Sequence, residues 1–166
     1  MNQEIPNAEA MLQTLIKQEE ALQFERFTFD NAWQLGLVLR ERLLAHGGDG
    51  AADVTVAGVQ LFRCAVGEPT PNNTRWIRRK MNTVLETWKS SLRVYLEMHL
   101  SNRTPEEFGM NATDFVLAGG CFPIRVRSQG VIGTVTVSGF PQTHDHQLAA
   151  DAVAAYLQVS IPSILD

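Results

Sequence analysis

One stretch decides the fold: residues 119–139, GGCFPIRVRSQGVIGTVTVSG. In its first half, the large apolar residues Phe122, Ile124 and Val126 alternate with Pro123, Arg125 and Arg127. This period of two is typical of a strand with one buried face, and the second half, Val131–Val137, is almost entirely β-branched. Gln129-Gly130 is the turn signal between them. The stretch therefore predicts a β-hairpin, with Gly133 at a bulge or at a close approach of another backbone.

Helical patterns surround this hairpin on both sides. Apolar residues recur at helical spacing over about 8–22, 30–46, 74–88, 90–100 and 143–159. A second tight hairpin is predicted for Val54–Phe62 around Gly58. Consecutive strands joined by short turns favour an antiparallel sheet with helices packed on it. We expect one α+β domain over residues 1–166, in which residues 1–22 form an N-terminal helical extension.

Two of the predicted helices carry further expectations. The helix after Asp30, which that residue can cap, is apolar almost all round, so we expect burial on more than one side. The segment 67–74 holds two prolines and an Asn pair, which suit a loop, and Asn72, Asn73 or Thr74 can cap the next helix. Its inward face is predicted to include Lys80, Leu85 and Trp88.

Composition limits the classes of function. The chain has 166 residues and a formal charge of -4, which makes nucleic acid a poor partner. Its charged fraction of 19% is a little low, as expected when some surface is buried in an oligomer. Its two cysteines form no CxxC, the first ten residues lack the basic start of a secretory signal, and no run approaches the roughly 18 apolar residues of a membrane span. We expect a cytoplasmic protein with no membrane partner.

His144-Asp145-His146 is the most conspicuous metal candidate. Two residues apart on a helix, the imidazoles point to different faces, and no third ligand stands at a recognisable spacing. We therefore predict no metal. Thr143 is the expected helix cap, Asp145 complements the helix dipole, and His146 is a polar residue that lines a site. Phosphate-cradling motifs and a GxSxG elbow are both missing from the sequence.

Basic residues give two further candidates. Arg75, Arg78, Arg79 and Lys80 could bind an anion, or they could form a solvated helix face paired with Glu86 and Glu106; the second interpretation is favoured. Lys80 differs, because it lies on the apolar stripe and its buried ammonium needs a partner or a ligand. Arg125 and Arg127 lie roughly 7 Å apart on one strand face, where they could grip a carboxylate or bridge to neighbouring acids.

Several strings resemble a known family. In order they are Trp76-Ile77, Arg79-Lys80, Asn82-Thr83-Val84-Leu85, Ser90-Ser91, Gly119-Gly120, Phe122–Val126, Gly133–Gly139, Pro141-Gln142 and Asp145-His146. Together, over about Leu12–Leu157, the chain resembles an uncharacterised subfamily of the GlcG/HbpS-like "haem-degrading domain" family. The resemblance implies a profilin-like antiparallel sheet of about five strands flanked by helices, and a homodimer or larger ring-like oligomer. Some relatives bind haem, whereas the closer subfamily has no established reaction. The chain departs from the family at Glu86-Thr87, where an Arg-Phe pair is usual.

The leading hypothesis is a small-ligand-binding module that is non-catalytic or weakly catalytic. Its pocket would lie where the 119–139 hairpin meets the Trp76 helix and the start of the last helix. Arg79, Lys80 and Arg125 would hold an anionic group such as a haem propionate, beside the other expected ligand-binding residues, Trp76, Asn82, Gly133 and His146. One alternative is an enzyme acting on haem or a small metabolite, with His146 as acid/base positioned by Asp145. Another is a structural or adaptor oligomer without ligand.

Overall fold

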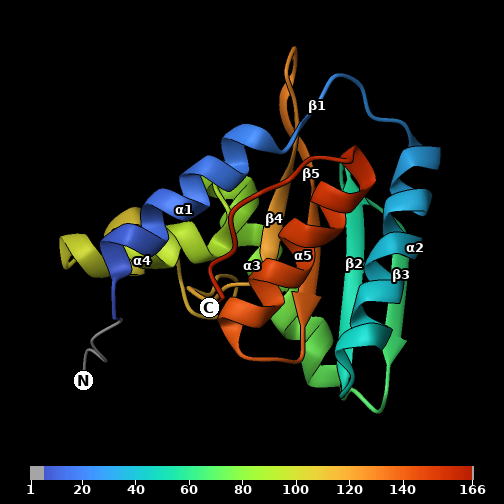
Figure 1. Ribbon diagram of the computed structural model, residues 1–166. Helices are drawn as coiled ribbons and strands as arrows, with labels where there is room; N and C mark the ends of the chain where they lie inside the picture. The colour runs from blue at the N-terminus through green and yellow to red at the C-terminus, as the bar shows by residue number, and fades with distance from the viewer. Residues whose placement is uncertain (1–5, 166) are drawn as a thin grey trace.

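Five strands form one mixed sheet in the computed structural model, which describes residues 6–165 (Figure 1). Their order across the sheet is β1-β4-β5-β2-β3. The bounds are β1 Gln23–Phe24, β2 Gly50–Val56, β3 Val59–Val66, β4 Cys121–Val126 and β5 Gly130–Ser138. All neighbours are antiparallel except the two-residue β1, which pairs with β4 in parallel. The predicted α+β fold of about five strands is confirmed, and this short edge strand makes the sheet mixed.

Helices cover both faces of the sheet. They are α1 Ala8–Ala21, α2 Phe29–His46, α3 Pro71–Thr87, α4 Ser91–Ser101, the 3₁₀ turn η1 Pro105–Phe108, and α5 Gln142–Leu157. α2 and α5 pack side by side on one face, and α3 packs on the other (Figure 1). α1 lies along α4 at the β1 end of the sheet, where Leu15 and Leu92 are buried together. Residues 1–5 of the expected N-terminal extension lie outside the described residues.

The hairpin of β4 and β5 follows the prediction closely. Phe122, Ile124 and Val126 are fully buried under α2 and α5, and the turn lies at residues 127–129. The pairing shifts by one residue beside Gly133, which is the expected bulge. A Cβ on Gly133 would stand 2.2 Å from the carbonyl oxygen of Thr55 in β2. The close approach at Gly133 is therefore made by a neighbouring strand of the same sheet.

The two faces of the sheet differ in chemistry. Toward α2 and α5 the strands present Val54, Val135 and Val137, which belong to the main apolar core. Toward α3 the alternate residues Asp53, Thr134 and Thr136 are polar, and all three are buried. Burial of a polar group is costly unless it finds a hydrogen-bond partner. α3 therefore covers a layer of polar side chains on this face of the sheet. Lys80 belongs to α3 and is buried on the same side.

Two helices begin at different residues from those predicted. α2 is capped by Thr28, whose hydroxyl accepts from the backbone N–H of Asn31 at 3.2 Å, so Asp30 lies in the first turn. α3 begins at Pro71 after Thr70, with the Asn73 side chain accepting from the Thr70 N–H at 3.0 Å. Both predicted caps are wrong. The start of α2 is set by the capping box of Thr28 and Asn31, and α3 starts at Pro71 because proline, with its fixed φ and absent N–H, suits the first position of a helix.

Several apolar side chains are more exposed than the sequence predicted. On α2, Trp33 is 52% exposed, Leu37 39% and Leu44 51%, so this helix is buried on one side only in the single chain. On α3, Leu85 and Trp88 are also half exposed rather than inward-facing. Within residues 6–165, no helix combines the length and hydrophobicity needed to cross a bilayer.

Candidate functional site

A surface cleft of about 320 Å³ opens where α3, the end of β5 and the start of α5 meet. We call it the central cleft. It is lined by Asn72, Asn73, Trp76, Lys80, Ala118, Ser138, Gly139, Phe140, Gln142 and Asp145. These residues come from three segments that the sequence analysis expected to converge. Most of the polar ones belong to strings that carry the family resemblance.

Lys80 and Asp145 form a buried ion pair at this cleft. Lys80 Nζ donates to Asp145 Oδ2 at 2.7 Å and to the carbonyl oxygen of Val137 at 3.0 Å. Each of the two side chains is only 3% exposed. An ammonium has three N–H donors, and these two bonds account for two of them. Lys80 was predicted to be buried with an ammonium that needs a partner or a ligand, and within the chain that partner is Asp145.

Asp145 is held by the backbone as well as by Lys80. Its Oδ1 accepts from the N–H of Phe140 at 3.0 Å. Burial raises the pKa of the Asp145 carboxyl, while the positive charge of Lys80 and the backbone bonds lower it less strongly. A buried ion pair is by itself weak evidence for stability.

Gly120 makes room for the ion pair. Its φ is +127°, and a Cβ there would stand 2.6 Å from Lys80 Nζ and 2.8 Å from Cβ of Asp145. Only glycine combines this backbone conformation with so close an approach. The Gly119-Gly120 pair in the quoted stretch is therefore required by the site beside it.

The walls of the central cleft combine aromatic rings with side-chain amides. Trp76 and Phe140 supply the rings. Asn73 donates to the carbonyl oxygen of Ser138 at 3.2 Å, and the side-chain oxygen of Gln142 accepts from the Gly119 N–H at 3.1 Å. Because Asn73 and Gln142 lie in the first turns of α3 and α5, both helices direct their positive dipole ends toward this region. The cleft can hold a small polar or anionic molecule with a flat apolar part.

His146 lies in the core and not in the cleft. Its Nε2 lies 2.8 Å from Gln18 Oε1, to which it donates, and its Nδ1 is buried without a partner. Burial lowers the pKa of His146 to about 3, which keeps the ring neutral. The Asp145 carboxylate contacts Lys80 and Phe140 instead of His146. The structure does not bring these two residues together as the acid/base pair that the enzyme hypothesis described.

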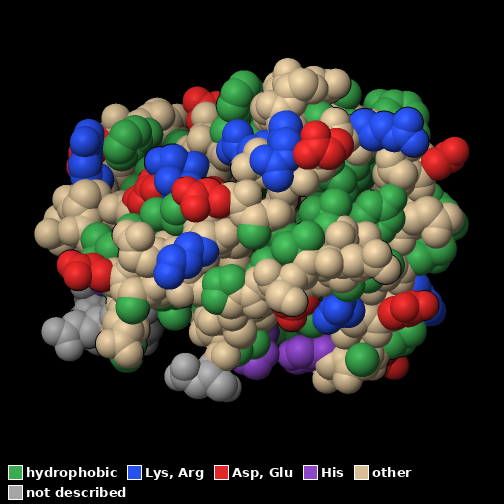
Figure 2. Space-filling model, turned by 45° about the horizontal axis from the view of Figure 1, so that its top comes forward, with side chains coloured by type: hydrophobic (Ala, Val, Ile, Leu, Met, Phe, Trp, Pro, Cys, Tyr) green, Lys and Arg blue, Asp and Glu red, His purple; other side chains and the backbone are tan. Residues whose placement is uncertain are grey.

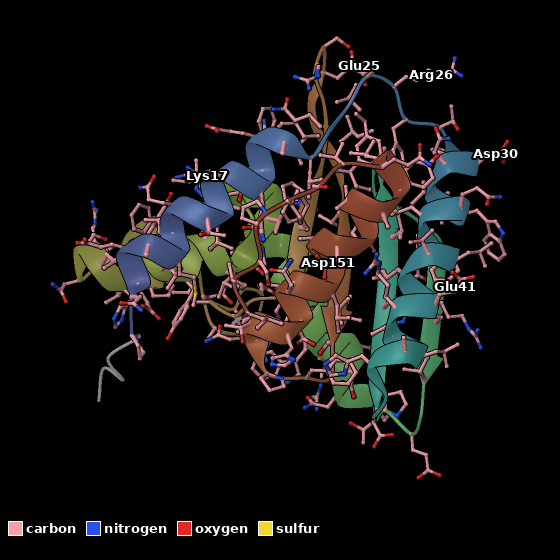
Figure 3. All side chains as sticks on the ribbon, in the orientation of Figure 1. Lys17, Glu25, Arg26, Asp30, Glu41 and Asp151 are labelled. Atoms are coloured by element: carbon pink, nitrogen blue, oxygen red, sulfur yellow. The ribbon has the colours of Figure 1, made fainter. Side chains whose placement is uncertain are left out.

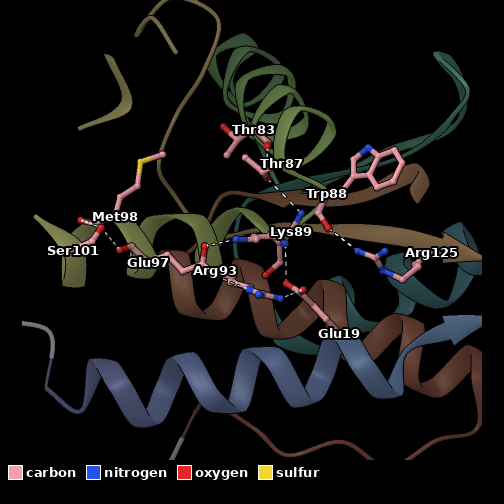
Figure 4. Close-up of polar contacts among 11 residues, drawn as sticks. Glu19, Thr83, Thr87, Trp88, Lys89, Arg93, Glu97, Met98, Ser101 and Arg125 are labelled. Atoms are coloured by element: carbon pink, nitrogen blue, oxygen red, sulfur yellow. Dashed lines mark hydrogen bonds and ion pairs between the residues drawn. The ribbon is translucent and has the colours of Figure 1, made fainter. Parts of the chain in front are cut away.

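Four other predicted ligand-binding residues lie outside the central cleft. Arg125 donates to the carbonyl oxygen of Trp88 at 2.7 Å (Figure 4). Asn82 donates to the carbonyl oxygen of Asp114, and Gly133 lies within the sheet. Arg79 lies over the Trp76 ring at 4.6 Å, but its guanidinium binds the carbonyl oxygen of Ala112. Arg127 pairs with Glu25, so the two hairpin arginines do not form one grip.

Of the ten residues that line the central cleft, Trp76 and Lys80 were predicted as ligand-binding, and Asp145 was predicted as the partner of His146. The other seven were not singled out: Asn72, Asn73, Ala118, Ser138, Gly139, Phe140 and Gln142. Ser138 and Gln142 stood in the resembling strings, which was the available signal.

The cap of α5 is Pro141 rather than Thr143, which places Gln142 at the first helical position. His144 instead contacts His46 at the end of α2, with 3.2 Å between Nδ1 and Nε2, and Figure 2 shows histidine side chains adjacent at the surface.

The donor set of the central cleft does not fit haem iron. Its lining contains no histidine, cysteine, methionine or tyrosine, which are the usual axial ligands. The buried thiol of Cys121 is held protonated, since burial raises its pKa to about 12. A haem in this cleft would be bound through its ring faces and propionates alone. Among the described residues no group of three or more metal-ligating side chains was found.

Fold and cleft together define a small α+β protein with a helix-covered sheet and one polar cleft beside a buried ion pair. Residues 27–154 match the family model "Haem degrading protein HbpS-like". The chain belongs to this HbpS-like family. It is 40% identical over 153 residues to a UPF0303 protein of Rhizobium leguminosarum bv. trifolii, covering 92% of this chain and 93% of that one. A UPF0303 protein of Acidobacterium capsulatum is 44% identical over 140 residues, covering 84% and 85%.

Solved structures share the fold. The crystal structure of Ybr137w protein superposes with a TM-score of 0.82 at 28% identity, covering 89% of this chain and 87% of that one. The structure of a PduOC:heme complex gives a TM-score of 0.64 at 15% identity, covering 82% and 97%. The second similarity concerns the fold alone.

Proposed function

We propose that this protein is a homo-oligomeric small-ligand-binding protein whose binding site is the central cleft. The observation that carries the proposal is the Lys80–Asp145 pair, buried at an open cleft of about 320 Å³. A buried pair is weak evidence for stability and stronger evidence for a role at the site that it faces. Five of the strings that resemble the family contribute residues to the same cleft: Trp76, Lys80, Ser138 with Gly139, Gln142 and Asp145.

The ligand chemistry follows from the lining. Trp76 and Phe140 favour a flat apolar body, and the amides of Asn72, Asn73 and Gln142 favour polar edges. Lys80 is already neutralised by Asp145, so its remaining N–H offers one hydrogen bond rather than a full counter-charge. Haem is the first ligand to test because of the family, although an axial ligand is not among the lining residues.

Self-association is the second part of the proposal. The exposed residues Phe29, Trp33, Leu37 and Leu44 form a stripe along the outer face of α2, which we call the α2 stripe. The first three recur every four residues, so they lie on one side of the helix. A second copy that packs its own α2 stripe against this one would bury them in a symmetric contact. The low charged fraction of the chain supports the same conclusion.

The cleft is tested by filling it. Ala118 lines the central cleft with a partly exposed side chain, so Ala118→Phe should block the site and leave the fold intact. Ala155, exposed on α5, gives Ala155→Phe as the matched control. Native mass spectrometry should detect a retained small molecule, or added haemin, with the unmodified chain and with Ala155→Phe only. The proposal would be rejected if the molecule also bound to Ala118→Phe. It would equally be rejected if the unmodified protein retained no molecule and bound no haemin.

A further inference from the structure

Three guanidinium groups from α3 line a second cleft, of about 290 Å³, beside the central cleft. Arg75, Arg78 and Arg79 share it with Asn72 and with residues 112–113 of the loop after η1. We call it the arginine cleft. Asn72 borders both clefts, and the Arg79 guanidinium lies 4.6 Å from the Trp76 ring that walls the central one. The two clefts therefore lie next to each other.

The positive charge of the arginine cleft is only partly compensated, because among residues 6–165 Arg78 has an ion-pair partner and Arg75 and Arg79 have none. The nearest carboxylate oxygen is that of Asp114, 3.6 Å from Arg78, and Asp114 also binds Asn111. The sequence analysis favoured pairing of these arginines with Glu86 and Glu106, but residues 6–165 contain no such ion pair. Glu106 borders a different cleft beside Arg79 without reaching pairing distance. The concentration of positive charge is notable because the whole chain has a formal charge of -4.

Backbone carbonyls orient the guanidinium groups without neutralising them. Arg79 Nη1 donates to the carbonyl oxygen of Ala112 at 3.1 Å, and Arg78 Nη2 donates to that of Thr113 at 3.4 Å. Arg79 Nε is buried and has no hydrogen-bond partner in the structure. A buried donor without a partner costs free energy, so Arg79 is held in this position at a cost. The planar guanidinium fork matches phosphate oxygens in geometry as well as in charge.

We propose that the arginine cleft binds the phosphate group of a small phosphorylated ligand whose flat body lies in the central cleft. This inference rests on the proposed function and assigns the ligand class. Phosphate is favoured over a single carboxylate because three guanidinium groups exceed what two carboxylate oxygens can engage, whereas a phosphate offers three oxygens and up to two charges. The small volume of the cleft, about 290 Å³, and the net negative charge of the chain favour a small molecule over nucleic acid.

Inorganic pyrophosphate is the probe, titrated into the full chain by isothermal calorimetry at low ionic strength. Arg75→Gln/Arg78→Gln removes two charges from residues that are largely exposed, so the fold should be kept. The matched control is Lys17→Gln/Arg26→Gln, whose exposed side chains project from α1 and from the loop after β1 (Figure 3). We expect at least tenfold weaker binding in the first variant and nearly unchanged binding in the second. Equal weakening in both variants, no binding to the unmodified chain, or equally tight binding of succinate would overturn the phosphate site.

The two proposals fail in different ways. Pyrophosphate binding that depends on Arg75 and Arg78, without any molecule that depends on Ala118, would keep the phosphate site and reject the central cleft. A retained molecule displaced by Ala118→Phe that contains no phosphate, and that Arg75→Gln/Arg78→Gln does not weaken, would do the reverse. Ala118→Phe should leave pyrophosphate binding unchanged, because Ala118 does not line the arginine cleft.

Discussion

Lys80 and Asp145 lie 65 residues apart in the chain, yet their charged atoms meet 2.7 Å apart at a position that water barely reaches. Each supports a different segment: Lys80 also binds the end of β5 through the carbonyl oxygen of Val137, and Asp145 binds the turn before α5 through the Phe140 N–H. One ion pair thus ties α3, β5 and α5 together at the central cleft. The geometry of the central cleft therefore depends on both Lys80 and Asp145.

The first prediction is that either charge alone is costly. Lys80→Met and Asp145→Leu each leave an unpaired buried charge, so each should lower the free energy of unfolding by about 3–5 kcal/mol. The double variant Lys80→Met/Asp145→Leu should cost less than either single change, because no uncompensated charge remains. Urea unfolding of the four proteins measures the cycle. Additive costs would show that the two charges act independently and would contradict the pairing described here.

The second prediction concerns pH and His146. The ring is neutral in the fold with a pKa of about 3, whereas an unfolded histidine takes a proton near pH 6.5. Between these values the unfolded state binds more protons, so stability should fall as pH drops from about 6.5 toward 3, by up to about 1.4 kcal/mol per pH unit. His146→Gln should flatten this part of the profile in denaturant titrations. A profile as steep in His146→Gln as in the unmodified protein would contradict this assignment.

The third prediction separates a structural glycine from a ligand contact. Gly133→Ala places a Cβ 2.2 Å from the rigid carbonyl of Thr55, so it should cost roughly 3 kcal/mol or more. Gly58→Ala is the control, since its Cβ would meet nothing within 4 Å and only the left-handed φ of +78° opposes it, at about 1 kcal/mol. Thermal unfolding compares the two. Equal losses would mean that β2 and β5 can separate locally and that Gly133 is free for another role.

Local features of the fold could be predicted from the sequence, whereas the tertiary partners of a residue could not. Period-two alternation and the Gln129-Gly130 turn are local signals, and they located β4 and β5 to within a residue or two. Lys80 was predictable as a buried ammonium, because it interrupts an apolar stripe at helical spacing. Its partner was not, since nothing in one sequence specifies which of 18 acidic residues approaches from another element. The same limit applies to the arginines, whose neighbours depend on where the loop after η1 folds.

The resembling strings identified the segments that meet at the central cleft, but not which of their residues line it. Arg125 and His146 stand in these strings, yet the tertiary structure turns the first toward Trp88 and the second into the core. Ser138 and Gln142 carry no conspicuous chemistry, but they follow a strand end and begin a helix, and such positions meet at the edges of layers. Their part in the cleft could be inferred only from their place in the strings.

The last prediction tests self-association through the α2 stripe. Leu37 on α2 is 39% exposed and Leu100 on α4 is 38% exposed, so Leu37→Glu and Leu100→Glu place the same charge at equally accessible positions. If α2 forms the contact between copies, Leu37→Glu buries a carboxylate in an apolar interface and should shift the protein to smaller species. Leu100→Glu should keep the mass of the unmodified protein. Sedimentation velocity over a hundredfold range of concentration measures both, and circular dichroism checks that each variant is folded. Dissociation by Leu100→Glu alone would place the interface on α4 instead, and a monomeric unmodified protein would reject self-association altogether.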